Sequence, residues 1–151
     1  MTLNRWQDTV VNLFSEIAIL ETLVKTRIND RRPSGLDENH FAMLNHMVRT
    51  EGRGETKAAL SWNFEDMCDN IDTEIEALAA NNLIVIRPDL ANNSQDHVML
   101  TPEGHDAYIS AIKTLSPDFE SLLSGITIED LDKTMVTLRE IRRTLDNLPD
   151  E

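Results

Sequence analysis

The sequence predicts a mainly helical protein with one small β-hairpin, in which long amphipathic helices flank a smaller lobe. Apolar residues recur with a seven-residue rhythm over residues 3–28, which is typical of a coiled-coil seam. Residues 37–81 contain three shorter helical patterns, and residues 83–101 contain two β-rich segments separated by a polar tip. A length of 151 residues suits one domain with a real core, so we expect a single domain over residues 1–151.

The first predicted helix begins near Leu3 and ends near Arg32, where several cations suit the negative end of a helix dipole. A second stripe at the other end of the chain follows Thr127, which can cap a helix. Such long apolar stripes need a partner, so residues 1–32 and 102–151 are expected to form a homodimer. The predicted interface residues are Leu3, Trp6, Val10, Leu13, Ile17, Leu131, Met135, Leu138 and Leu145.

The middle of the chain, residues 36–101, is expected to form the lobe. Asp37 can cap a helix that runs to about Thr50, and further helices are predicted over residues 55–64 and 69–81. Strands are predicted at 83–86 and 97–101, with a polar tip over 89–96. Pro102 then begins another helix, which the "SP" at 116–117 is expected to interrupt. Three helices followed by a hairpin is the order of a winged helix-turn-helix.

Three sequence blocks carry a resemblance to a known family: "LSWNF" (60–64), "IDTEIEALAANNLI" (71–84) and "VMLTPEGHD" (98–106). In this order and spacing the chain resembles the MarR family of winged-helix transcriptional regulators. The blocks stand where that family has its "LA..L" helix, its recognition helix ending in "L...GL", and the wing strand with "LT..G". Asn82 replaces the usual glycine, and asparagine also tolerates a left-handed backbone. The resemblance implies a dimeric regulator that binds DNA.

The charge of the lobe departs from this family. The whole chain carries a formal charge of −13, and residues 51–97 contain ten acids and three bases, a balance of −7. Where the family's wing carries an Asp-Arg-Arg motif, this sequence has "NNSQD" at 92–96 without any base. DNA-binding proteins gain much of their affinity by neutralising phosphates with Lys and Arg. Binding to DNA is therefore expected to be weak or atypical.

Two functional hypotheses remain open. In the first, a dimeric regulator contacts DNA through the few suitable side chains, which are Arg53, Lys57, Asn70, Thr73, Arg87, Asn93 and Ser94. In the second, a derived winged-helix protein does not bind DNA and contacts a basic protein or another regulator, as a DNA mimic or anti-regulator. The acids of the recognition helix would then form the partner face, namely Asp69, Asp72 and Glu76.

Other site predictions are minor. The resemblance implies an effector cleft, for which the candidates are Phe14, Phe41, His46 and Tyr108. Cys68 lies between acids and is predicted to be passive rather than redox-sensing, and Trp62 is predicted to pack inside the helix-turn-helix.

No catalytic constellation, cofactor motif or metal motif is predicted, because His40 and His46 are six residues apart and cannot share a helix face. The absence of a leader or a long apolar run predicts a cytoplasmic protein that does not contact membranes.

Overall fold

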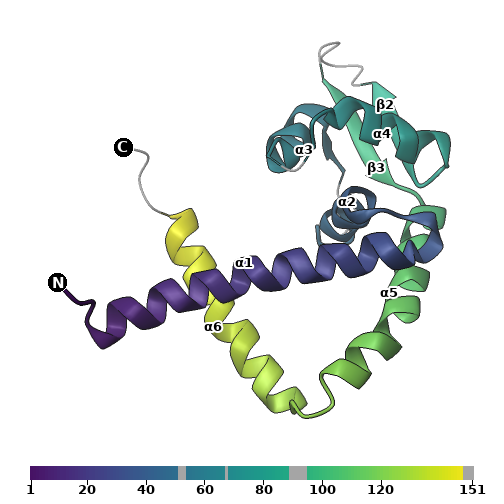
Figure 1. Cartoon of the computed structure of the whole chain (residues 1–151). Coiled ribbons are helices and arrows are strands. Elements are labelled where there is room, and N and C mark those ends of the chain that lie inside the picture. The colour runs from purple at the N-terminus through teal and green to yellow at the C-terminus, as the bar shows by residue number, and fades with distance from the viewer. Residues whose placement is uncertain (51–53, 67, 89–94, 148–151) are drawn as a thin grey trace. The chain divides into compact units, whose positions relative to one another are not determined.

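The computed structural model describes residues 1–50, 54–66, 68–88 and 95–147 (Figure 1). The chain divides into two compact units, Met1–Leu115 and Ser116–Glu151, and each is described by itself. The prediction of one domain over residues 1–151, with dimerisation helices at 1–32 and 102–151 and a lobe at 36–101, stays a prediction. In the described residues the fold is mainly helical with one small antiparallel sheet, as predicted. None of the described helices is both long and apolar enough to cross a membrane.

The first helix, α1 (Arg5–Arg31), matches its predicted extent. Asn4 caps it through a reciprocal pair of hydrogen bonds. The Asn4 side chain accepts from the Gln7 backbone N–H at 2.9 Å, while the Gln7 side chain accepts from the Asn4 N–H at 3.0 Å. The helix ends at Arg32, which adopts a left-handed backbone with φ of 41°. A 3-10 turn, η1 (Pro33–Gly35), leads into the lobe.

Three helices build the lobe: α2 (Glu38–Arg49), α3 (Lys57–Phe64) and α4 (Ile71–Ala80). Each helix is capped by a side chain that accepts a hydrogen bond from a backbone N–H of its first turn. The capping residues are Asp37, Thr56 and Asn70, respectively. Their apolar faces meet the sheet in one core, which contains Met43, Leu44, Met47, Leu60, Phe64, Ile75, Leu78, Ile84, Val98 and Ala111. This shared core fixes how α3 and α4 are presented to a partner.

The sheet has the strand order β1-β3-β2 (Figure 1). Strand β2 (Ile84–Pro88) pairs antiparallel with β3 (Asp96–Leu100), so the predicted hairpin is confirmed. The prediction of helix from residue 55 was wrong, because Glu55 and Thr56 form β1, which pairs with Val98 and His97 of β3. Asp96 pairs with Pro88 and therefore belongs to the strand rather than to the tip. The rest of the predicted tip, 89–94, lies outside the described residues.

The wing strand turns directly into α5 (Pro102–Leu122). The Thr101 hydroxyl donates to the Asn82 carbonyl at 2.6 Å and accepts from the Gly104 N–H at 2.9 Å. A Cβ at Gly104 would lie 2.0 Å from the Leu83 carbonyl oxygen, so only glycine allows this close approach of helix and strand.

The predicted interruption of this helix at 116–117 was wrong, because α5 continues through Pro117. A proline inside a helix removes one i→i−4 hydrogen bond, here the one to the Lys113 carbonyl, at a cost of about 3 kcal/mol. The helical bonds on either side persist, including the one from the Leu123 N–H to the Phe119 carbonyl at 2.8 Å.

The last helix, α6 (Ile128–Asp146), begins at Thr127, whose side chain accepts from the Asp130 N–H at 3.2 Å. Both long stripes are open to solvent in the single chain. On α1 the exposed side chains include Trp6, Leu13 and Ile17, and no described residue of α6 is buried. Apolar faces of this extent are unusual on a monomer, so they support the dimer prediction, which the single chain does not test.

Candidate nucleic-acid interface

Helix α4, which stands where the resemblance predicts a recognition helix, carries exposed acidic side chains. Ile75 and Leu78 are buried on one side of the helix, whereas Asp72, Thr73 and Glu76 are exposed on the other. Asp69 is also exposed but precedes the helix, so it lies before the first turn rather than on it. A face with two carboxylates and one hydroxyl offers acceptors for cations or amino groups and repels phosphates.

Asn70, predicted as a direct DNA contact, has a structural role. Its side-chain oxygen accepts from the Thr73 N–H at 3.3 Å and caps α4. Substitution of such a cap by alanine costs about 1 kcal/mol. The amide nitrogen of Asn70 is the group that could still donate to a phosphate or a base.

The cations around this face are few in the described residues, and one of them is already engaged. Lys57, at the start of α3, places its Nζ atom 3.1 Å from Oδ1 of Asp72 (29% and 64% exposed, respectively). This pair joins the two helices of the helix-turn-helix and lowers the positive charge that Lys57 can offer. Arg87 is exposed on β2, one residue before the end of the strand that leads into the hairpin tip, and not at the base of the wing. Arg53, Asn93 and Ser94 lie outside the described residues, so their candidacy stays a prediction.

The four effector-cleft candidates are not brought together as one group by the described contacts. The Phe41 and Tyr108 rings lie 5.5 Å apart in a tilted arrangement, and the Tyr108 hydroxyl donates to Oδ1 of Asn45 at 2.7 Å. His46 instead makes a 2.7 Å contact with Oε1 of Glu55 and meets the Phe64 ring edge-on. Phe14 is 44% exposed on α1. An effector cleft built from these residues stays a prediction.

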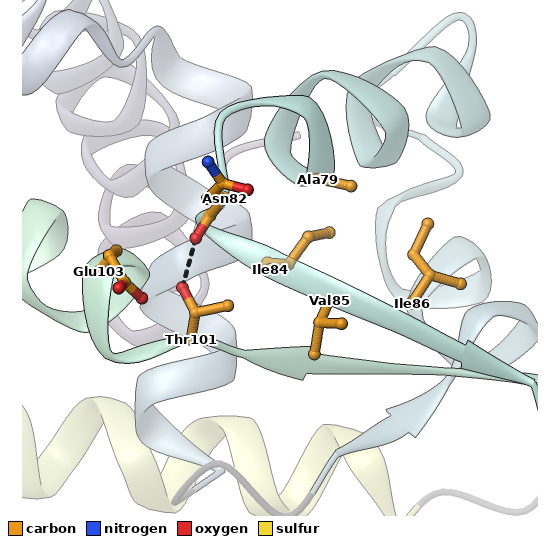
Figure 2. Close-up of a pocket in the computed structure, with 7 residues that line it drawn as sticks. All are labelled: Ala79, Asn82, Ile84, Val85, Ile86, Thr101 and Glu103. Atoms are coloured by element: carbon orange, nitrogen blue, oxygen red, sulfur yellow. Dashed lines mark hydrogen bonds between the residues drawn. The ribbon is translucent and has the colours of Figure 1, made fainter.

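Two open hollows lie elsewhere in the lobe. The first has a volume of about 560 Å³ and lies beside the end of α4 and strand β2 (Figure 2). Figure 2 shows Ile84, Val85 and Ile86 along its strand side, with the Thr101 to Asn82 hydrogen bond near one end. Asn82 has a φ of 60°, the left-handed conformation expected where the family has glycine. No sequence pattern indicated this hollow.

The second hollow, of about 480 Å³, lies between α3 and the start of α4. It is lined by Ala58, Ser61, Trp62, Glu65, Cys68, Asp69 and Ile71. Trp62 is 79% exposed, so the prediction that it packs inside the helix-turn-helix was wrong. Buried Leu60 and Phe64 of α3 face the core instead. An exposed indole beside two carboxylates is chemically suited to a cationic group.

Cys68, at the edge of this hollow, has the environment of an unreactive thiol. Burial raises the pKa of the Cys68 thiol, and the charges of Glu74, Asp37, Asp69 and Glu38 raise it further. The thiolate is the reactive form, and a raised pKa lowers its fraction at neutral pH.

We expect Cys68 to react with a thiol reagent at pH 7 more slowly than it does in the same chain unfolded in guanidinium. Asp69→Asn should speed the reaction because it removes one nearby carboxylate, whereas Glu129→Gln, on α6, should leave the rate unchanged. The measurement is the pseudo-first-order rate with a chromogenic disulfide. Faster labelling of the folded chain would contradict a passive Cys68.

Several solved structures have a fold similar to that of this chain. No protein-family model and no curated protein matches the sequence. Among solved structures, the transcriptional regulator BldR from Sulfolobus solfataricus is similar at 18% identity and a TM-score of 0.75, over 94% of this chain and 99% of that one. A MarR family transcriptional regulator from Silicibacter pomeroyi is similar at 19% identity and a TM-score of 0.67, over 94% and 99%.

A third neighbour was solved in complex with DNA. A mutant of MarR from E. coli, complexed with operator DNA, is similar at 13% identity and a TM-score of 0.65, over 92% of this chain and 99% of that one. Over nearly its full length, the chain therefore has the winged helix-turn-helix fold of these MarR-type transcriptional regulators.

Proposed function

We propose that the chain is a homodimeric, cytoplasmic transcriptional regulator whose winged-helix lobe binds DNA weakly or only at a narrow set of sites. The fold supports the regulator class, and a neighbour of the same fold binds operator DNA. The observation that carries the weak binding is the charge of the recognition face. Asp72 and Glu76 point outward from α4, and Lys57 is paired with Asp72.

This electrostatic arrangement predicts a shallow dependence of DNA affinity on salt. Each phosphate neutralised contributes roughly −0.9 to the slope of log affinity against log salt. With Lys57 engaged, Arg53 and Arg87 are the remaining candidates in each protomer, so two protomers would give a slope of about −4 at most. Genomic fragments around the chain's own gene, titrated at several salt concentrations, provide the measurement.

We expect little binding to arbitrary DNA at physiological salt and detectable binding to at most a few fragments. Tight and steeply salt-dependent binding to arbitrary DNA would mean that the DNA face lies elsewhere. The basic segments at 25–32 and 139–143 would then be the next candidates to test.

A second candidate function is favoured by the exposed indole of Trp62. Aromatic side chains are enriched at protein interfaces, and this one shares a hollow with Glu65 and Asp69. A basic partner protein could place an Arg or Lys side chain against the indole and the carboxylates. In that case the chain would act as an anti-regulator or DNA mimic through its acidic face, and DNA would not bind at all.

A further inference from the structure

Three side chains with metal-ligating atoms converge where α2 and α4 begin. Asp37 caps α2, His40 lies in the first turn of α2, and Glu74 lies in the first turn of α4. Nδ1 of His40 is 3.5 Å from Oδ1 of Asp37, and Nε2 of His40 is 2.5 Å from Oε2 of Glu74. All three side chains are partly buried, with exposed fractions of 17% for His40, 27% for Asp37 and 24% for Glu74.

One ring nitrogen of His40, Nε2, has no hydrogen-bond partner among the described residues. Nε2 is shielded from solvent, and its close contact with Glu74 does not have the alignment of a hydrogen bond. A buried polar atom without a hydrogen bond costs free energy, so such atoms are uncommon in folded proteins. An imidazole nitrogen that meets a carboxylate oxygen without a hydrogen bond between them is well placed to share a cation with it.

The donor set suits a divalent transition metal. One ligand atom from each of the three residues lies within 4.8 Å of the others. Zinc binds imidazole nitrogen and carboxylate oxygen at about 2.0–2.2 Å, which separates two ligands of one tetrahedral ion by about 3.4 Å. Small side-chain rotations would open the contact between His40 and Glu74 and draw Asp37 inward. Two carboxylates would balance the two charges of the ion.

The electrostatic surroundings also favour a cation. The charges of Glu74, Asp37, Asp69 and Glu38 all act on the nearby Cys68 thiol, so carboxylates from the starts of both helices gather in one place. Lys57, at the start of α3, pairs with Asp72 rather than with this cluster. We propose that Asp37, His40 and Glu74 form a binding site for one divalent transition-metal ion, such as Zn²⁺ or Mn²⁺, that joins α2 to the recognition helix.

The alternative is an ion-pair bridge, in which a protonated His40 holds the two carboxylates without any metal. This bridge and the metal site differ in their response to added metal and to conservative substitution. Asp37→Asn keeps a good helix cap while it removes a charge, and Glu74→Gln is nearly isosteric. His40→Gln removes the imidazole. His105→Gln is a matched control, because His105 is an exposed histidine beside an acid, Asp106, on α5.

The test is a competition titration of the chelator-treated, full-length protein with Zn²⁺ against a chromophoric chelator. We expect one ion per chain, and each of Asp37→Asn, His40→Gln and Glu74→Gln should weaken its binding at least about tenfold, or about 1.4 kcal/mol. His105→Gln should bind like the unmodified chain. Millimolar Mg²⁺ should not displace Zn²⁺, because imidazole is a poor ligand for Mg²⁺.

A second measurement keeps the proposal testable if a variant folds poorly. Saturating Zn²⁺ should raise the melting temperature of the unmodified chain and of Cys68→Ser, but not that of His40→Gln. The proposal would be overturned by the absence of Zn²⁺ binding, by equal loss in His40→Gln and His105→Gln, or by loss in Cys68→Ser with His40→Gln unaffected. Because this test contains no DNA, its failure would leave the proposed regulator function untouched.

Discussion

A charged residue at Leu13 or at Leu138 is expected to abolish the homodimer. Leu13 is 36% exposed in the single chain and lies on the α1 seam with Trp6 and Ile17. Leu138 lies at the centre of the α6 stripe, between Leu131 and Leu145. If these stripes form the interface, the part of each leucine that is still exposed in the single chain is removed from water when two copies associate.

The expected effect is large because a two-fold dimer contains each substitution twice. Burial of a leucine side chain contributes about 1.5–3 kcal/mol, and a carboxylate placed in an apolar interface adds a desolvation cost of its own. Loss of two such leucines removes roughly 3–6 kcal/mol, and each 1.4 kcal/mol is a factor of ten. We therefore expect the dissociation constant to rise by at least about a hundredfold.

Sedimentation velocity at micromolar concentration is the measurement for Leu13→Glu and Leu138→Glu. Asn12→Asp is the matched control, because Asn12 is exposed on α1 but lies outside the seven-residue seam. Leu138 is partly buried in the single chain, so circular dichroism must show that Leu138→Glu is still helical. Leu131→Glu, at an exposed position of the same stripe, provides a second variant. A monomeric unmodified chain, or an intact dimer in all three glutamate variants, would refute this interface.

The parts of the fold that the sequence predicted well depend on local interactions. Asp37 and Thr127 each cap the helix predicted for them, because a cap requires only a side chain and a backbone N–H three residues away. The errors involve interactions beyond that range. Strand β1 is two residues long and exists only because β3, about forty residues later, pairs with it. At Pro117 the rule that proline ends a helix failed, because the loss of a single hydrogen bond did not end α5.

The role of the candidate site stays a prediction, but the structure does show Asp72, Thr73 and Glu76 exposed on one side of α4, which agrees with a helical period. The pairing of Lys57 with Asp72 depends on how α3 packs against α4, which no spacing rule contains. The cluster around His40 was missed for the same reason. Its ligands come from two helices, and a search for histidines at helical spacing cannot find a site with one histidine.

The acids at the start of the recognition helix are expected to be the main barrier to DNA binding. In Asp69→Asn/Asp72→Asn the lobe loses two negative charges and Lys57 loses its carboxylate partner. A freed Lys57 can neutralise a phosphate in each protomer, which would steepen the salt slope of a dimer by about 1.8. We expect non-specific affinity at low salt to rise at least about tenfold, which corresponds to about 1.4 kcal/mol. Asn93→Arg and Ser94→Arg should also raise the non-specific affinity for DNA, since they add bases to a segment that has none.

The measurement is fluorescence anisotropy with a labelled duplex of arbitrary sequence, titrated at several salt concentrations. Glu129→Gln/Asp132→Asn, on the exposed surface of α6, changes the net charge of the chain by the same two units on a different helix. If the barrier is local to the start of α4, this control should change the affinity much less than Asp69→Asn/Asp72→Asn does. Equal gains in the two variants would assign the barrier to net charge instead. If the chain contacts a basic protein, the recognition-helix variant should weaken that complex while the α6 control leaves it intact, because the attraction comes from Asp69 and Asp72 themselves.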